Sequence, residues 1–384
     1  MSKGGKYLRQ EPKKDKGKKG KKVTLLVLAI VVVLIAAVAV AGIMFYNASL
    51  DKIKKAEVIE QDVTMNEEME KLMGIQDTEP TMPETTAPAT EATQAPAQET
   101  IDPNKEPDIL NVLVTGQSYR EGEDSRLADT NILVTINKDT KVVTLTSFFR
   151  DTYVDLADYK GHPCGWNRIN TAYALGYMWG GTGGAMEMTN MTIKNNFGIE
   201  VDYNVEIDFT AFTKIIDILG GVRIDLTEAE AKYLNEHKYG WQEEVQPGEN
   251  RLFGDYALSY ARMRKADGDG ESDIKRTERQ RKMIEAILKK LMSKGISVVR
   301  EMADEILPMI TTNMTNSQIT SAMLDLLPIL PDITIEKGTC PVETTYWSEY
   351  KELPDGGAHV LVFASEQQKR LMMPITEGIT FDTP

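Results

Sequence analysis

The sequence holds few of the residues that enzymes use for nucleophilic or metal chemistry. Its 384 residues include two cysteines, three histidines and only 7% aromatic residues. A tetrahedral zinc site needs three or four nitrogen or sulfur ligands at characteristic spacing, which these residues do not supply. A G-x-S-x-G motif is also missing, so a hydrolase with a Ser-His-Asp or Cys-His arrangement is not indicated. Any metal ion would have to bind to carboxylates.

Long apolar runs are scarce as well, with one exception. Val23–Tyr46 contains 24 residues without a charge, and as a helix rising ~1.5 Å per residue it would cross a bilayer. Residues 1–22 on its N-terminal side contain ten Lys or Arg and two acidic residues. By the positive-inside rule they form a cytoplasmic tail. We therefore predict a single-pass protein of the cell membrane, with a transmembrane helix at 23–46 and the rest of the chain extracellular.

A cleaved signal peptide is the alternative interpretation of this run, although the apolar core of a signal peptide is usually ~7–15 residues long. Under either interpretation the rest of the chain is exported. An oxidising compartment would permit one disulfide, between Cys164 and Cys340. We state that bridge as a hypothesis.

Residues 47–107 are predicted to connect the membrane to a folded domain. Residues 47–77 have the composition of a juxtamembrane helix. Residues 78–107 are rich in Pro, Thr, Ala and Glu, cannot bury a core, and would reach ~90 Å if extended at ~3.1 Å per residue. We expect this extracellular linker to hold the domain away from the membrane.

Residues 108–384 are predicted to form one α/β domain with a central mixed β-sheet flanked by helices. Runs of β-branched residues alternate with amphipathic stretches, a pattern typical of helices packed on a sheet. Phe209 and Phe212 recur at helical spacing, and they either pack in the core or line a ligand cavity. A glycine-rich stretch at 180–184 has no Lys-Ser/Thr ending, so it is interpreted as a flexible turn into a helix and not as a phosphate loop. The expected strands are 108–116, the runs of 130–149 on either side of the turn residues 137–140, 203–208 and 222–226. The expected helices are 184–198, 209–221 and 276–294.

A cluster of eight basic residues lies between 262 and 282, in a chain whose formal net charge is −14. A helix can begin there at Ser272 or Asp273, either of which would cap its first amides. On one face of this helix Arg276 and Gln280 precede apolar residues, so the inward stripe starts polar. Burying an arginine requires a carboxylate or an anion, and a helix N-terminus also favours negative charge. The pattern indicates a phosphate-type ligand.

Arg262 and Arg264 precede that helix. In an extended segment their i, i+2 spacing sends both guanidinium groups to one side, and arginine suits bidentate phosphate binding. The alternative is a solvated face balanced by neighbouring Asp and Glu residues. Nucleic acid is not indicated as the ligand, because the exported part is acidic and its aromatic residues are not interleaved with the cluster.

Several separated stretches resemble one family, the LytR-CpsA-Psr (LCP) proteins. They are "ADTNILVTIN", "SFFRDTYV", "RINTAYALG", "VEIDFTAFTKIIDILGGVRIDL" and "GDYALSYARMRKADGDGESDIKRTERQRKMIEAI", in matching order across 108–292. The resemblance implies an LCP-type α-β-α domain. It also implies a Mg-dependent phosphotransferase that moves a glycopolymer, such as teichoic acid or capsule, from a polyprenyl-pyrophosphate carrier to peptidoglycan. An apolar cavity between sheet and helices would hold the polyprenyl tail.

The family motifs also imply roles for individual residues. Four residues would hold the pyrophosphate, and Arg150 of "SFFRD" would lie near the same head group. These four are Arg262, Arg264, Arg276 and Gln280. Arg262 and Arg264 would act in catalysis as well, together with Asp129.

Asp129 of "ADTNILV" matches the family aspartate that binds magnesium, a hard cation suited to carboxylate and phosphate oxygens. Two neighbouring positions depart from the pattern. Ser118 replaces a carboxylate that usually orders the metal, and Leu127 replaces an arginine, although Arg126 is adjacent. The general base stays open between Asp151 and Asp129.

Two other functions are compatible with these residues. A regulatory module could keep the polyprenyl-phosphate pocket and have weak or absent transferase activity, as Ser118 and Leu127 suggest. A pyrophosphatase could use water in place of the sugar hydroxyl. The interpretation that we prefer is the transferase, with polyprenyl-pyrophosphate-linked glycopolymer, peptidoglycan and the membrane as partners.

Overall fold

The computed structural model describes residues 50–59, 108–117, 126–237, 242–264, 266, 273–294, 305–326, 329, 332–354 and 356–378. The predicted cytoplasmic tail, the predicted transmembrane helix and the linker at 78–107 lie outside these residues. Among the helices that are described, none combines the length and the apolar character needed to span a bilayer.

A mixed β-sheet forms the centre of the domain. Within the described residues it contains seven strands in the order β1-β10-β7-β2-β3-β4-β11. Strands β2, β3 and β4 form an antiparallel meander, β7 is parallel to β2, and β11 is parallel to β4. The bounds are Lys54–Lys55 (β1), Ile109–Gln117 (β2), Ala128–Asn137 (β3), Val142–Phe148 (β4), Tyr203–Asp208 (β7), Thr311–Thr312 (β10) and Thr334–Cys340 (β11). The predicted mixed sheet is confirmed.

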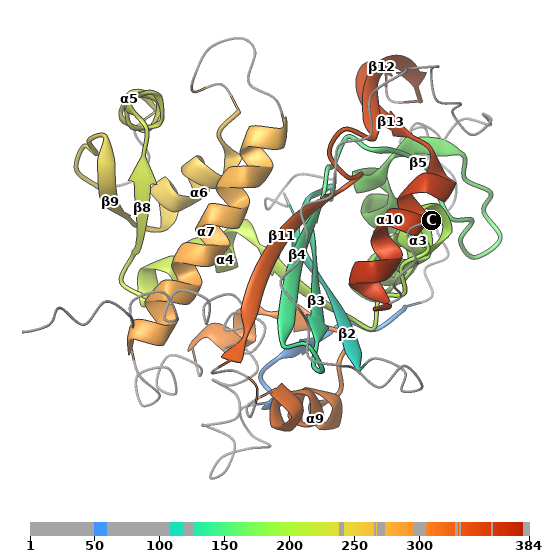
Figure 1. Cartoon of the computed structure of the whole chain (residues 1–384), viewed down its shortest axis with the longest axis horizontal. Helices are drawn as coiled ribbons and strands as arrows, with labels where there is room; N and C mark the ends of the chain where they lie inside the picture. Colours follow the sequence, from blue (N-terminus) through green and yellow to red (C-terminus); the bar gives the residue numbers. More distant parts are fainter. Residues whose placement is uncertain are drawn as a thin grey trace, which may run out of the picture.

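Helices cover both faces of this sheet. Figure 1 shows α4, α6 and α7 on one side, and α3 and α10 on the other. Successive side chains of β3 serve the two layers in turn, as a strand requires: Ile132 belongs to the core under α4, α6 and α7, and Leu133 to the core under α3. The helix bounds are Ile169–Phe197 (α3), Phe209–Ile218 (α4), Glu228–Glu236 (α5), Gly254–Arg262 (α6), Asp273–Lys294 (α7), Asn316–Leu326 (α9) and Ser365–Thr376 (α10), with a short 3-10 helix at Leu307–Met309.

Three two-stranded sheets complete the described part. They pair β5 with β6, β8 with β9, and β12 with β13. Their bounds are Tyr153–Asp155 (β5), Trp166–Arg168 (β6), Val222–Leu226 (β8), Gly248–Leu252 (β9), Tyr346–Leu353 (β12) and Gly356–Phe363 (β13). The expected strands at 203–208 and 222–226 are confirmed as β7 and β8. Between them α4 ends before Gly220 and Gly221, whose φ angles of 74° and 76° suit glycine.

Residues 50–59 differ from the expected juxtamembrane helix. The backbone turns at Leu50–Ile53, and Lys54–Lys55 form the edge strand β1. The amide of Lys54 donates to Ile310 O at 3.1 Å, and the amide of Ala56 donates to Thr312 O at 2.8 Å. Leu50 and Ile53 are buried in the core. Pairing with β10 and burial of two apolar side chains outweigh the local helix propensity.

The glycine-rich stretch at 180–184 lies inside α3 as a kink. Gly180 and Gly181 leave helical geometry, and Gly181 has a φ of 62°. The expected turn is therefore present, but helix precedes it as well as follows it.

Cys164 and Cys340, both in the described part, are buried thiols with no disulfide between them. The bridge hypothesis is wrong for this structure. Burial raises the pKa of the Cys164 thiol to about 12, with Asp158 and Asp155 adding to the effect. Burial also raises the pKa of Cys340 well above its usual value. Both cysteines fill the core between the sheet and α3 as apolar side chains.

Candidate functional site

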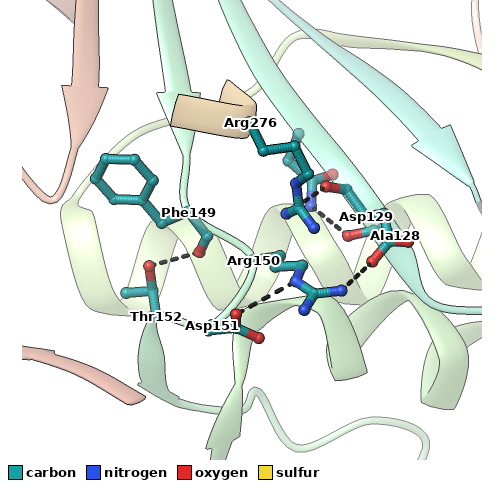
Figure 2. A network of polar contacts seen from close by, with 8 residues as sticks. Ala128, Asp129, Phe149, Arg150, Asp151, Thr152 and Arg276 are labelled. Carbon is teal, nitrogen blue, oxygen red and sulfur yellow. Dashed lines mark hydrogen bonds and ion pairs between the residues drawn. The ribbon is translucent and has the colours of Figure 1, made fainter. Parts of the chain in front are cut away.

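A network of charged side chains lies at one end of the central sheet. Asp129 is the second residue of β3, and Arg150 follows the end of β4. Since β3 and β4 are antiparallel neighbours, with Asn131 paired to Phe148, these two positions meet. Arg150 Nη1 donates to Asp129 Oδ1 at 2.9 Å, and Arg150 Nε donates to Asp151 Oδ2 at 3.3 Å (Figure 2). One guanidinium group is thus held between two carboxylates.

Arg276 reaches the same network from α7. Its Nη2 donates to the carbonyl oxygen of Asp129 at 3.4 Å, and the residue is only 3% exposed. In Figure 2 its guanidinium group lies beside Asp129 and above Arg150. The prediction that a buried arginine begins the inward stripe of this helix is confirmed. Gln280, one turn further along, is half-buried on α7.

Arg262 and Arg264 lie on the exposed side of the same region. Arg262 is the last residue of α6 and not part of an extended segment, so that expectation is wrong; the extended residue is Met263 (φ −59°, ψ 129°). Both arginines nevertheless line one open pocket of 640 Å³. The other lining residues are Ala229, Lys232, Tyr233, Glu236, His237 and Ala266. The guanidinium carbon of Arg262 lies 4.6 Å from the centre of the Phe209 ring.

The sheet register relates this pocket to the charged network. Phe209 directly follows Asp208, the last residue of β7. Asp208 is paired with Gln117, which in turn is paired with Ala128, the neighbour of Asp129. Arg262, through its contact with Phe209, therefore lies at the same end of the sheet as Arg150 and Arg276. Phe209 makes a cation–π contact with Arg262 at this end of the sheet, whereas Phe212 packs against the core.

Two further arginines of the basic cluster, Arg279 and Arg281 of α7, have structural roles that the sequence does not reveal. Arg279 Nε pairs with Glu230 Oε1 at 2.7 Å, and the two side chains are only 4% and 5% exposed. Arg279 Nη1 also donates to the carbonyl of Met263 at 3.1 Å. This bond fixes the backbone between the two pocket arginines. The available signal was the i, i+3 spacing from Arg276, which places Arg279 beside it on the helix.

Arg281 contacts the sheet. Its Nη1 donates to the carbonyl of Gly338 on β11 at 3.3 Å. Burial lowers the pKa of Arg281 from its usual value, partly opposed by Glu278 and Glu343. Arg281 therefore attaches α7 to the edge of the sheet.

The described residues contain no group of three or more His, Cys, Asp and Glu side chains that could hold a metal ion. Asp129 and Asp151 are the two carboxylates of the network. Of the two departures from the family pattern, Ser118 lies outside the described residues and Leu127 is half-buried. Arg126 stacks on α3, with its guanidinium carbon 4.0 Å from the centre of the Tyr177 ring.

A second buried carboxylate lies near Arg126. Glu206 of β7 accepts a hydrogen bond from the hydroxyl of Tyr173. Burial raises the pKa of Glu206, and the contacts with Tyr173 and Arg126 partly oppose that rise. Arg126 thus favours the ionised form of Glu206, on the face of the sheet that α3 covers.

Comparison with known proteins identifies relatives of the chain. The LytR_cpsA_psr family model matches residues 77–355. TagT of Bacillus subtilis strain 168, a polyisoprenyl-teichoic acid–peptidoglycan teichoic acid transferase, is 33% identical over 275 residues, which cover 70% of this chain and 75% of TagT. Biofilm regulatory protein A of Streptococcus mutans is 30% identical over 265 residues, covering 68% of this chain and 61% of that protein. The match thus spans less than two thirds of the second relative.

Solved structures agree with the fold. The crystal structure of B. subtilis TagT has a TM-score of 0.51 at 24% identity and covers 73% of this chain and 95% of that one. A protein from Streptococcus agalactiae has a TM-score of 0.53 at 25% identity and covers 72% of this chain and 90% of that one. The central sheet and its helical layers are therefore a known arrangement.

Proposed function

Since the chain belongs to the LytR-CpsA-Psr family, we propose that it transfers a glycopolymer from a polyprenyl-pyrophosphate carrier to peptidoglycan at the outer face of the membrane. A sugar hydroxyl of peptidoglycan attacks the phosphorus that bears the glycopolymer. A phosphodiester bond forms, the bond to polyprenyl phosphate breaks, and the hydroxyl proton passes to a base. The family match and the name of the relative TagT support this reaction.

The observation that carries the proposal is the gathering of arginines at one end of the sheet. Arg150 and Arg276 meet at Asp129, and Arg262 and Arg264 line the adjoining pocket. Phosphoryl transfer depends mainly on positioning and on stabilising charge, which fixed guanidinium groups provide. We assign Arg150, the two pocket arginines, Arg276 and Gln280 to the diphosphate.

The two ends of the substrate then lie in different surroundings. The polyprenyl tail would enter the apolar layer between the sheet and α4, α6 and α7, which is lined by side chains such as Val112, Ile132 and Met283. The glycan, bonded to the other side of the diphosphate, would extend into the 640 Å³ pocket past Lys232 and Tyr233. A volume of this size is usual for a site that holds a small ligand.

Asp129 is the residue that would hold a magnesium ion, and Asp151 lies close to it through Arg150. Magnesium is commonly bound by one or two carboxylates together with phosphate oxygens, so two carboxylates beside a diphosphate site fit this ion. When bound, the ion would neutralise charge on the diphosphate. Asp151, or Asp129 where the metal leaves it available, would accept the proton of the attacking hydroxyl.

An acceptor-dependent transfer assay tests the function. The purified full-length protein is incubated with polyprenyl-pyrophosphate-linked glycopolymer, peptidoglycan and magnesium. We expect glycopolymer to become covalently attached to peptidoglycan, with release of polyprenyl phosphate, and we expect chelation of magnesium to reduce the rate. Phosphate release without attachment would indicate a pyrophosphatase. Tight binding with neither product would indicate a regulatory module, the function that Leu127 and Ser118 favour.

A further inference from the structure

The segment at 50–59 packs within the folded domain. Leu50 is fully buried, and β1 extends the edge of the central sheet. Beyond β1 the segment continues onto α3: the amide of Ile59 donates to Gly180 O at 3.1 Å, and the amide of Gly183 donates to Glu57 O at 3.2 Å. Lys160 Nζ donates to Ile59 O at 3.0 Å. The segment is thus held at both of its ends.

The glycines of the α3 kink make this contact possible. A Cβ atom on Gly183 would lie 2.2 to 2.4 Å from backbone atoms of Glu57 and Val58. Real Cβ atoms do not approach other atoms so closely, so any larger residue at 183 would displace the segment. The glycine-rich stretch of α3 therefore provides the surface on which residues 57–59 pack.

Residues 50–53 lie against the start of α9. Asn316 Nδ2, at the start of α9, donates to Asp51 Oδ1 at 2.8 Å. At the other end of α9, Asp325 pairs with Lys138 in the turn between β3 and β4. Asp129 lies at the opposite end of β3, roughly 30 Å away at ~3.3 Å per residue. Figure 1 shows α9 and β5, the strand that follows the Arg150 network, at opposite ends of the sheet.

The chain length then limits where a membrane can lie. The apolar run ends at Tyr46, four residues before Leu50. Four residues span at most ~14 Å when fully extended. If the run crosses a bilayer, the surface of that bilayer lies next to α9.

The exposed face of α9 is suited to such a surface. Leu324 is 63% exposed, and the one charged residue of the helix, Asp325, shares Lys138 with Asp108. The other residues of the helix that the structure describes as exposed are Ser317, Gln318 and Ser321. In a strongly acidic chain this face carries little charge to repel an anionic membrane.

We propose that α9 and residues 50–55 form a base that rests on the outer surface of the membrane, with the arginine site pointing away from it. The inference rests on the proposed membrane anchor, and it specifies how the proposed transferase is oriented relative to the membrane. The diphosphate would be held roughly 30 Å from the bilayer, on the side of the cell wall. The polyprenyl tail would enter the apolar layer from the α9 end, where Leu50 and Ile53 belong to the same core.

If this orientation holds, the linker would have a different role from the predicted spacer. Residue 59 contacts α3 and residue 108 begins the approach to β2, where the amide of Asp108 donates to Asp139 at 2.9 Å. Residues 60–107 therefore connect two points of one domain. A spacer that holds the domain off the membrane would have to lie before residue 50, and too few residues separate that position from the apolar run.

Quenching of fluorescent probes by lipids tests the orientation. The full-length protein carries one added cysteine, either L324C on α9 or E343C near the arginine end, labelled with a maleimide dye. The two native cysteines are buried thiols. The protein is reconstituted into phosphatidylcholine–phosphatidylglycerol vesicles that contain a lipid with a spin label on its head group. We expect strong quenching at position 324 and little at 343. Equal quenching, or stronger quenching at 343, would overturn the orientation.

Two further measurements test separately the membrane anchor and the role of the docked segment. Flotation of the protein with the vesicles tests the anchor, and loss of flotation would reject the anchor and this inference together, whatever the transfer assay gives. G183A should displace residues 57–59 and reduce the difference between the two probes, with thermal unfolding as the check on the fold. G338A is the matched control, because its Cβ would meet only Thr146 Oγ1 at 3.7 Å. Unchanged quenching in G183A would show that the docked segment does not set the orientation.

Discussion

Replacing both Arg262 and Arg264 by alanine should abolish glycopolymer transfer while leaving the fold intact. Both side chains line the pocket at the diphosphate end and neither is part of the core. Removing one preorganised donor from a developing negative charge typically costs ~10²–10³ in rate, so losing two should place transfer below detection. Because both side chains are exposed, the free energy of unfolding should change far less than the rate of transfer.

The matched control is Arg223→Ala. Arg223 is 74% exposed, on β8, and pairs only at the surface with Glu249. Its replacement should leave both transfer and thermal unfolding unchanged within about 0.5 kcal/mol. A further variant, Arg262→Lys with Arg264→Lys, keeps both charges but loses bidentate geometry, and we expect an intermediate rate. Transfer at the parent rate in the double alanine variant would contradict these roles.

Arg279→Met should strongly destabilise the fold. It leaves the carboxylate of Glu230 buried without its partner, and breaking a buried ion pair in this way costs about 3–5 kcal/mol. It also removes the hydrogen bond to the carbonyl of Met263, so the backbone between Arg262 and Arg264 loses its support. We expect a lower midpoint in urea unfolding and, in the fraction that stays folded, weaker binding of the diphosphate.

The double variant Arg279→Met with Glu230→Gln separates the unpaired charge from a general loss of packing. The carboxylate of Glu230 also accepts a hydrogen bond from the amide of Thr227 in the capping box of α5, and the side-chain oxygen of glutamine can accept the same bond. The double variant should therefore recover a large part of the stability that Arg279→Met loses. If it is as unstable as the single variant, the buried charge is not the cause.

The sequence predicts those parts of the fold that depend on local patterns. Strands β2, β3 and β4 follow from β-branched runs around the turn at 137–140, where the amide of Thr140 donates to Asn137 Oδ1 at 2.9 Å. The edge strand β1 could not be predicted, because Lys54 and Lys55 have no strand pattern. Their conformation is decided by β10, more than 250 residues later in the chain.

The site shows the same division. Asp129 and Arg150 are implied by the family motifs alone, and the pairing of β3 with β4 then brings them together. Arg276 follows from the polar start of a core-facing helix stripe. The Glu230–Arg279 pair joins two helices. The i, i+3 spacing from Arg276 indicates where Arg279 lies on α7, but not which carboxylate it meets. The shared pocket of Arg262 and Arg264 was predicted for a wrong reason. It results from the end of α6 and the extended residue Met263, not from an extended strand.

A crystal structure of the protein with a polyprenyl-pyrophosphate-linked glycan and magnesium tests the central claim most directly. We expect phosphate oxygens within hydrogen-bond distance of Arg262, Arg264 and Arg276, with the tail between the sheet and α7 and the glycan beside Lys232. A diphosphate bound away from these arginines, or a tail lying outside the apolar layer, would contradict it.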